Sequence, residues 1–371
     1  MSRHRADRWR SSLVNLGLVE PDMNPVSPTT VHGAPVISAQ FKVEPEDFVV
    51  REWLGFDADG EGDHMLLTVR KRGANTLWVA KQLARFAKAD VRDVGFAGLK
   101  DRQAVTEQAY TLPSRNLQPN DWIGFTGEGF EVMGAVRQRR KLRRGAHKGN
   151  DFEIVLRDVR GDRDALLQRL QQIKELGAPN YFGPQRFGHD GYNLRMAEDW
   201  LVQGNEIRDR AQRGFALSAA RSLIFNAVLQ ARIEQGTWQQ LLPGDLANLN
   251  GSNSVFAVTE VDETLRRRCA EFDVHPTGPL WGSGALRVTA TTAELETRIG
   301  EQYVALATGL AAAGLEQERR ALRVWVQNLT WTMEESRLIL KFRLHRGAFA
   351  TAVLAELLGL AANALGENED A

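Results

Sequence analysis

A carboxylate flanked by two cations is the feature of this sequence with the clearest chemical potential. Asp101 lies between Lys100 and Arg102, within the stretch of residues 95–106 (GFAGLKDRQAVT). Neighbouring positive charge favours the ionised form of a carboxyl group, which is the form that a nucleophile or a general base needs. Charged tripeptides are also common at solvated turns, where ion pairs contribute little. Asp101 is therefore either a catalytic carboxylate or part of a surface turn.

The flanking sequence predicts that Asp101 lies on a loop between two strands. Residues 94–97 are typical of the end of a short strand, and a second strand is expected from Gln103 onward. Gly98 is expected to make the turn, because glycine adopts positive φ angles easily.

The same stretch closely resembles the signature of the tRNA pseudouridine synthase D (TruD) family, in which the equivalent of Asp101 is the catalytic residue. Further segments resemble that family in the same order along the chain. They are residues 42–50 (KVEPEDFVV), 60–64 (GEGDH), 75–76 (NT), 148–152 (KGNDF), 180–188 (NYFGPQRFG), 218–222 (SAARS) and 346–351 (RGAFAT). One such match would be weak, whereas the ordered series from residue 42 to residue 351 is specific.

The resemblance also implies a pocket for a nucleotide. A base removed from its stack needs an aromatic face and a polar group for its Watson–Crick edge. Phe48, Asn150 and Phe349 align with family positions that contact the substrate, and Phe152 is a further candidate for the pocket wall. Lys42 aligns with a family position near the active site and could bind a phosphate or orient the catalytic carboxylate.

Two positions depart from the family pattern close to this pocket. His345 and Ala348 stand where the family more usually has proline and serine. The resemblance to the family therefore does not imply the shape of the loop that precedes Phe349 in this chain.

The reaction implied by the resemblance is the isomerisation of uridine to pseudouridine, and the family's specificity for position 13 of tRNA is carried over by resemblance only. Moving uracil from an N-glycosidic to a C-glycosidic bond needs no redox change and no phosphate energy. One carboxylate can therefore suffice, either as a nucleophile at the sugar or as a base that starts an elimination. We expect an isomerase that needs no cofactor, with Asp101 acting on a flipped-out uridine.

Two other classes of function remain open at this stage. An RNA-binding or RNA-folding factor could keep the fold and do little catalysis, and its function would not depend on Asp101. A glycoside hydrolase would need a second carboxylate across the scissile bond. Asp47 and Glu52 are available for that role, but no spacing in the sequence ties them to Asp101.

A cluster of positive charge precedes the segment that contains Asn150. In residues 137–148, here called the basic segment, seven of the twelve side chains are lysine or arginine. Such runs are often solvated faces, and they also neutralise nucleic-acid backbones. Its place directly before Asn150 and Phe152 favours binding of the RNA backbone. The candidate side chains are Arg137, Arg139, Arg140, Lys141, Arg143, Arg144 and Lys148.

Composition limits the class of protein and its partners. The chain has 371 residues, of which 43% are hydrophobic and 25% charged, as in a folded protein of two domains. Lysine plus arginine and aspartate plus glutamate both total 47, so RNA would have to bind a local basic surface. The single cysteine, Cys269, excludes an internal disulfide and suits a reducing compartment.

Neither a metal site nor a membrane role is expected. The seven histidines include no pair at the spacing of a helix-borne metal site, and residues 60–62 lack the third glycine of a dinucleotide fingerprint. The longest apolar run, residues 348–365, contains Glu356 and is too short to span a membrane. We therefore expect a cytoplasmic monomer that acts on tRNA without an obligate protein partner.

The order of the predicted elements indicates an α+β fold. Strands are predicted over residues 36–41, 48–52 and 65–69, followed by a helix over residues 76–87 that Asn75 or Thr76 would cap. Residues 162–176 have the pattern of an amphipathic helix, and Gly177 with Pro179 marks its end.

A mostly helical region follows, and strands then return. Helices are predicted over residues 190–202 and over residues 218–235 with Ser218 as N-cap, whereas residues 180–188 are expected to pack two domains together. Strands are predicted over residues 325–331 and 338–344, before a last helix over residues 348–365.

This order predicts a discontinuous catalytic domain. Its first part would be residues 1–176, with residues 1–34 as a peripheral arm, and its second part residues 325–371. Residues 177–324 would form a mostly helical α/β insertion domain. The resemblance implies the same arrangement, with a central, mainly antiparallel sheet of the pseudouridine-synthase type.

Overall fold

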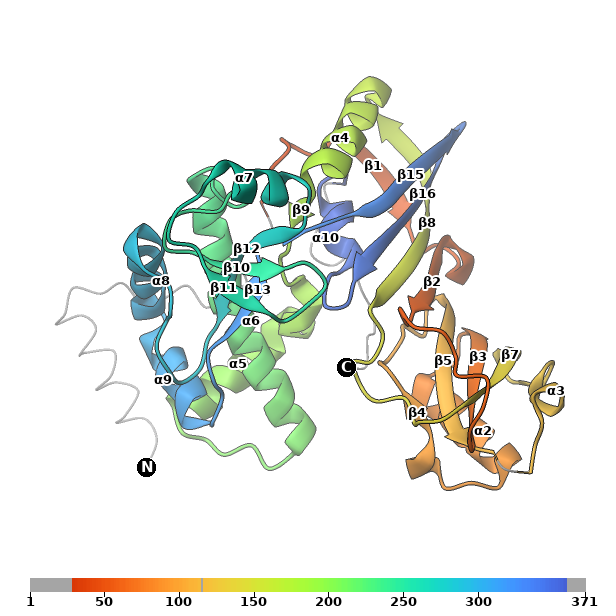
Figure 1. The fold of residues 1–371 in the computed structure, drawn as a ribbon. Helices are drawn as coiled ribbons and strands as arrows, with labels where there is room; N and C mark the ends of the chain where they lie inside the picture. Colours follow the sequence, from red (N-terminus) through yellow and green to blue (C-terminus); the bar gives the residue numbers. More distant parts are fainter. Residues whose placement is uncertain (1–28, 115, 359–371) are drawn as a thin grey trace.

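The structure is a computed structural model that describes residues 29–114 and 116–358 (Figure 1). It has the predicted α+β architecture, because a large, mainly antiparallel sheet lies beside a helix-rich part that contains a smaller sheet. Most of the predicted peripheral arm, and residues 359–365 of the predicted last helix, lie outside the described residues.

Strands from both ends of the chain build the large, ten-stranded sheet. Its order is β15-β16-β8-β2-β5-β3-β7-β6, with β1 also paired to β8 and β4 to β5, and the β2–β5 pair is parallel. The strands are β1 (Ile37–Phe41), β2 (Phe48–Trp53), β3 (His64–Arg72), β4 (Gly95–Phe96), β5 (Val105–Pro113), β6 (Thr126–Gly127), β7 (Phe130–Gln138), β8 (Gly149–Gly161), β15 (Gln327–Glu334) and β16 (Arg337–His345).

The long strand β8 joins the early and late parts of the chain. It pairs with β2, so that Glu52 lies opposite Asn150, and with β16, so that Leu344 also lies opposite Asn150. Figure 1 shows β16, coloured blue, beside the yellow-green β8. Residues nearly 200 positions apart in sequence are thus held in one register.

Helices cover the apolar faces of the large sheet. Helix α2 (Thr76–Ala87) begins at Asn75, whose side chain accepts the backbone N–H of Leu77, and it packs on the β3–β5–β7 region. Helix α4 (Arg163–Leu176), capped by Asp162, and helix α10 (Ala350–Ala355) bury their apolar residues with those of β8 and β16. The short helices here are η1 (Pro45–Asp47), η2 (Val91–Asp93) and α3 (Pro119–Trp122).

The helix-rich part is arranged around helix α6 (Arg210–Glu234), in which Leu223, Phe225 and Leu229 are fully buried. A second sheet, in the order β11-β10-β12-β13, lies against it. The remaining elements are η3 (Pro184–Phe187), η4 (His189–Gly191), α5 (Tyr192–Ala197), the π-helical η5 (Glu198–Val202), β10 (Leu246–Leu249), β11 (Val255–Ala257), α7 (Glu263–Ala270), β12 (Val274–Leu280), α8 (Ala290–Gln302), α9 (Val304–Ala312) and β13 (Glu318–Ala321).

The two segments that lead into and out of the helix-rich part pair with each other. Strand β9 (Ala178–Pro179) is antiparallel to β14 (Arg323–Val324), so the chain enters and leaves at one place. The sequence predicts the limits of an insertion domain at residues 177 and 324, beside this pair. The division into domains itself stays a prediction.

The predicted start of helix α6 was wrong. The helix begins at Arg210, because the Asp209 carboxylate accepts the backbone N–H of Gln212 at 2.8 Å and caps it there. Ser218 therefore lies in the helix interior. Gly98 was also predicted to make a turn with a positive φ angle. This prediction was wrong, because the φ angle of Gly98 is not positive.

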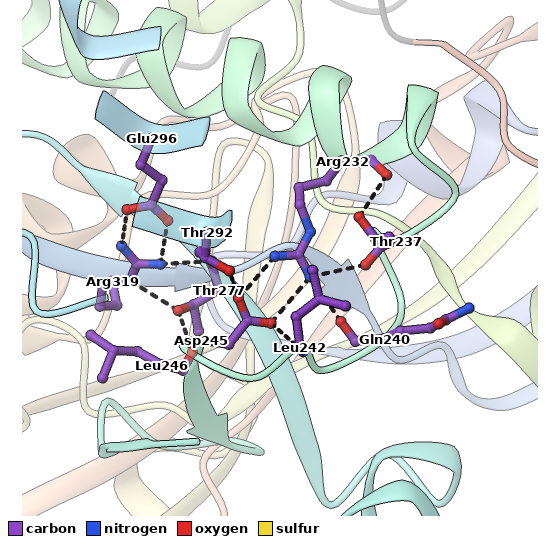
Figure 2. Close-up of polar contacts among 10 residues, drawn as sticks. All are labelled: Arg232, Thr237, Gln240, Leu242, Asp245, Leu246, Thr277, Thr292, Glu296 and Arg319. Carbon is purple, nitrogen blue, oxygen red and sulfur yellow. Dashed lines mark hydrogen bonds and ion pairs between the residues drawn. The ribbon is translucent and has the colours of Figure 1, made fainter. Parts of the chain in front are cut away.

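Two buried ion pairs cross-link the interior of the helix-rich part (Figure 2). The Arg232 guanidinium binds both carboxylate oxygens of Asp245, at 2.9 and 3.1 Å, and also the backbone carbonyls of residues 237 and 240. The Arg319 guanidinium binds both oxygens of Glu296 at 2.8 Å. Because their charges are paired, these residues can lie inside an otherwise apolar interior.

We expect Arg232→Met to lower the free energy of unfolding by about 3–5 kcal/mol, because the variant leaves the Asp245 carboxylate buried without its cation. Urea unfolding followed by tryptophan fluorescence measures the loss. The matched control is Arg268→Ala, which removes an exposed ion pair with Asp273 and is expected to cost less than about 1 kcal/mol. Equal losses in the two variants would contradict a dominant role for the buried pair.

Candidate active site

Asp101 lies on the loop between β4 and β5, as the sequence predicts, but it is not a solvated surface turn. Its side chain is only 5% exposed and forms an ion pair with Lys42, with 2.5 Å between Oδ2 and Nζ. The other oxygen, Oδ1, accepts the backbone N–H of Gln103 at 2.8 Å. Contacts at both of its oxygens therefore fix the orientation of the carboxylate.

Lys42 reaches the carboxylate from the end of β1. Its Nζ lies 4.4 Å from the ring centroid of Phe48, so the ammonium contacts both an aromatic face and Asp101. The backbone of Lys42 has a φ of 57°, a left-handed conformation that is uncommon for a residue with a side chain. This turn directs the lysine toward Asp101.

A second lysine supports the loop from beneath. Lys71 lies on β3, is 1% exposed, and donates to the backbone carbonyls of Ala74, Lys100 and Asp101 at 3.1, 3.3 and 3.2 Å. The ammonium has three donors, and three carbonyls accept them. The loop backbone at Asp101 is thus anchored to the sheet.

Uncharged side chains complete the support of the loop. The hydroxyl of Thr76 accepts the backbone N–H of Lys100 at 3.2 Å and donates to the amide oxygen of Gln108. The amide nitrogen of Gln108 donates to the carbonyl of Gly98 at 2.5 Å. The loop is therefore held at Gly98 and at Lys100 before it reaches Asp101.

The neighbouring Lys100 connects Asp101 to Asn150. Its ammonium lies 3.0 Å from a carboxylate oxygen of Glu52 and donates to the side-chain oxygen of Asn150 at 2.8 Å. Glu52 also accepts the backbone N–H of Ala109 at 3.0 Å, and its side chain is 1% exposed. The amide of Asn150 is thus oriented by a buried ion pair.

These contacts weaken the hypothesis of a glycoside hydrolase. Glu52 is engaged by Lys100, and Asp47 is engaged by Arg157, with 2.9 Å between the guanidinium and Oδ1. Neither carboxylate contacts Asp101 in the part of the chain that the structure describes. A second catalytic carboxylate facing Asp101 is therefore not provided by either candidate.

The predicted aromatic residues divide into two groups. Phe48 and Phe152 lie in the core of the large sheet, with ring centroids 6.0 Å apart, and Phe48 contacts Lys42. Phe349 instead contacts Phe182 of the helix-rich part, at 6.2 Å between centroids. Phe349 follows the end of β16, four residues after His345, which lies opposite Gly149.

His345, one of the two departures from the family pattern, packs at the start of the loop before Phe349. The imidazole lies against Trp53, with centroids 5.8 Å apart, and its Nδ1 is 3.4 Å from the carbonyl of Lys148. A Cβ added at Gly251 would lie 2.9 Å from the imidazole, so the ring fills the space between the sheet and the helix-rich part. Burial lowers the pKa of His345.

The basic segment does not present all of its cations in the same way. Arg137 is half-buried and donates to the backbone carbonyls of Ser114 and Leu117, at 2.6 and 2.8 Å. Arg139 pairs with Glu61. The other five side chains are exposed, and these are Arg140, Lys141, Arg143, Arg144 and Lys148. Arg137 therefore has a structural role that its sequence context did not reveal.

Lys71 is the site residue that our sequence analysis missed. It shares the inward face of β3 with Leu67 and Val69, at alternate positions, so strand periodicity places its side chain inside. The strand periodicity of the sequence could therefore have identified Lys71 as a lysine with its side chain inside the protein. In the described residues, no group of three histidine, cysteine, aspartate or glutamate side chains is arranged as a metal site, and no helix is long and apolar enough to cross a membrane.

We expect Lys71 to make the stability of the protein depend on pH. Burial lowers the pKa of Lys71 from 10.5 to about 8, so above pH 8 the folded state loses a proton that the unfolded state keeps. Stability should therefore rise with pH between 8 and 10.5. Relative to Lys71→Met, the parent should gain about 1 kcal/mol between pH 7 and pH 9 in urea unfolding.

The control for this measurement is Lys81→Met, which removes an exposed lysine of helix α2. The difference in stability between the parent and this variant should not change with pH over the same range. If the parent and Lys71→Met also show parallel pH profiles, the buried ammonium does not titrate as expected.

Comparisons with known proteins place this geometry in a family. Residues 29–212 and 205–357 match the family described as tRNA pseudouridine synthase D (TruD). A protein of Nitrosococcus oceani named tRNA pseudouridine synthase D is 43% identical over 327 residues, covering 87% of this chain and 91% of that protein. A protein of Xanthomonas euvesicatoria with the same name is 47% identical over 344 residues, covering 88% and 93%.

The fold is also similar to a solved structure. The crystal structure of a putative tRNA pseudouridine synthase D from Methanosarcina mazei superposes with a TM-score of 0.72, covering 91% of this chain and 97% of that one at 20% identity. The family match, the similar relatives and the shared fold agree, and this chain belongs to the tRNA pseudouridine synthase D (TruD) family.

Proposed function

We propose that this protein is a tRNA pseudouridine synthase that isomerises uridine at position 13 of tRNA, with Asp101 as its catalytic carboxylate. Relatives 42–47% identical over most of their length carry the name tRNA pseudouridine synthase D, which supports the reaction and the substrate. The observation that carries the assignment of Asp101 is its ion pair with Lys42 on a loop anchored by Lys71.

The chemistry needs the carboxylate at the sugar of a uridine that has left its stack. Asp101 either attacks C1′, forming an O–C1′ bond as the C1′–N1 bond breaks, or removes a sugar proton to start an elimination. The freed uracil turns and its C5 bonds to C1′, as the O–C1′ bond breaks in the first route or as the sugar regains its proton in the second. The hydrogen at C5 is then lost to solvent and N1 regains a proton. Every step uses one carboxylate and the substrate's own atoms, so the proposal requires no cofactor.

The site residues have distinct proposed roles around that carboxylate. Lys42 holds Asp101 in direction and supplies a positive charge beside it. Phe48 and Phe152 form the apolar wall behind Lys42, and Asn150 offers an amide to the uracil edge from the end of β8. Phe349 closes the pocket from the side of the helix-rich part. The enzyme would act as a cytoplasmic monomer, in keeping with its single, buried cysteine.

We expect Asp101→Asn to lower pseudouridine formation by at least about a thousandfold, because the amide can neither attack C1′ nor accept a sugar proton. The assay is tritium release from tRNA transcripts that carry tritium at C5 of uridine, with tRNA binding measured in parallel. The matched control is Asp93→Asn, which changes an exposed carboxylate near the same loop and should keep full activity.

The outcomes separate the competing functions. Release by the parent with no release by Asp101→Asn, at equal tRNA binding, is the expected result. Release retained by the variant would assign catalysis to another group. No release by either protein, with tight tRNA binding, would favour the RNA-binding factor over the enzyme.

The exposed cations of the basic segment should bind the RNA backbone. We expect the double variant Arg140→Gln/Arg143→Gln to weaken tRNA binding by about tenfold. The logarithm of the tRNA-binding constant should also depend less steeply on the logarithm of the salt concentration, with a slope smaller in magnitude by about 1–2. Its kcat should stay near that of the parent. Arg137→Gln is the control, because that guanidinium binds carbonyls of its own chain, and it should lower the melting temperature without changing the slope. If the slope is unchanged in the double variant, the basic segment is a solvated face and does not bind the RNA backbone.

A further inference from the structure

The side-chain amide of Asn150 is held at one end by a group that only donates hydrogen bonds. The ammonium of Lys100 donates to Oδ1 of Asn150 at 2.8 Å. A lysine ammonium has three donors and no acceptor, so it binds the oxygen of an amide and cannot bind the nitrogen. Lys100 therefore determines which end of the Asn150 amide lies beside it, and the NH2 group is directed to the other side.

Glu52 holds Lys100 in this position. The Lys100 ammonium lies 3.0 Å from Oε1 of Glu52, and the two side chains are 7% and 1% exposed. Oε2 of Glu52 accepts the backbone N–H of Ala109 at 3.0 Å, which fixes the carboxylate on the sheet. Among the described residues, Glu52 forms no other ion pair. Because an unpaired charge is costly in the interior, the carboxylate keeps the ammonium next to Asn150.

The register of strands β2 and β8 brings these side chains to the site. Glu52 lies directly opposite Asn150 in the β2–β8 pair. Asn150 shares a face of β8 with Phe152, because side chains two residues apart on a strand point to the same side. Lys100 immediately precedes Asp101 in sequence, so the oriented amide lies next to the loop that carries the carboxylate.

The nitrogen end of the Asn150 amide is available to a ligand. In residues 29–114 and 116–358, no atom accepts a hydrogen bond from Nδ2, and the side chain is half-buried. The NH2 group carries two donors. A ligand atom that meets them must accept a hydrogen bond, because a second donor there would leave both groups unpaired. The site therefore selects for an acceptor at this point.

Lys71, a second buried lysine beside this loop, is held differently. It gives its donors to three backbone carbonyls and so supports the path of the chain. Lys100 instead gives a donor to a side chain whose other end has no partner in the part of the chain that the structure describes. The contact thus joins a buried ion pair to a group that a ligand meets.

We propose that Lys100 and Glu52 are positioning residues that make the site select uracil over cytosine. With its oxygen held by Lys100, Asn150 donates from Nδ2 to the carbonyl oxygen at C4 of the flipped uracil. Cytosine carries an amino group at C4, so a donor would face a donor. A free amide would turn over and accept from that amino group, and the ion pair prevents this turn. This inference rests on the proposed function for the identity of the base.

The first test measures binding of tRNA transcripts that carry uridine or cytidine at position 13. The reference chain is the full-length Asp101→Asn variant, in which no turnover occurs, and it should bind the uridine transcript at least about tenfold more tightly. When Lys100→Met/Glu52→Leu is added, this ratio should fall to about twofold or less, because the amide is free to turn. Replacing both partners avoids the unpaired buried charge that one substitution would leave.

Two further variants separate the orientation of the amide from the stability of the fold. Arg51→Met removes a partly exposed ion pair with Glu153 on the opposite face of β2 and should keep the ratio. Lys100→Arg keeps a cation that only donates, so it should keep part of the preference for uridine. A variant that merely loosened the fold would bind both transcripts more weakly and leave their ratio unchanged.

A second probe tests whether the contact is at C4 of the base. A transcript with pyrimidin-2-one riboside at position 13 carries a base that is cytosine without its amino group. The reference chain should bind this transcript more tightly than the cytidine transcript, because no donor then faces Nδ2 of Asn150. With Lys100→Met/Glu52→Leu, the cytidine transcript should bind at least as tightly as the pyrimidin-2-one transcript.

Two results would overturn the inference. One is the same preference for uridine in the reference chain and in Lys100→Met/Glu52→Leu, and the other is equal binding of cytidine and pyrimidin-2-one by the reference chain. Tritium release by the chain with Asp101 restored tests the proposed function separately. If that chain releases no tritium but the preference for uridine still depends on Lys100, the reaction is wrong and the recognition of the base stands.

Discussion

The geometry of Asp101 depends on the buried ammonium of Lys71. An ammonium without acceptors could not remain inside the sheet, and the acceptors here are the backbone carbonyls of residues 74, 100 and 101. The same bonds that satisfy the lysine therefore define the path of the loop that carries Asp101. Because the carboxylate of Asp101 is set by backbone positions and by Lys42, its direction is established before any substrate arrives.

Strand β8 supplies the other constraint, since it places the rest of the site in register with that loop. Through β2 it positions Glu52 and Asn150 opposite each other, and through β16 it brings the segment of Phe349 to the same end of the sheet. The pairing of β9 with β14 lets the chain leave and return without disturbing this register. A discontinuous sequence can thus build one continuous sheet.

Local patterns predicted those parts of the structure that depend on neighbouring residues. Asn75 at the start of α2 and the loop position of Asp101 followed from caps, turns and strand periodicity. Two local predictions were wrong. Gly98 has no positive φ, and Gln108 holds its carbonyl. Helix α6 starts at Arg210 because Asp209 caps it, and not at Ser218. The contacts of Arg137 and Lys71 with backbone carbonyls involve other segments of the chain, so they exist only once those segments meet.

The buried cations of this molecule are held in different ways. Arg232 is matched by the carboxylate of Asp245, and Lys71 by three backbone carbonyls. Arg320 donates to both the side-chain oxygen and the backbone carbonyl of Asn180, and the ring of Phe182 faces its guanidinium. Because the charge of Arg232 and the donors of Lys71 are matched within the chain, these two equally buried residues are expected to govern stability rather than affinity for RNA.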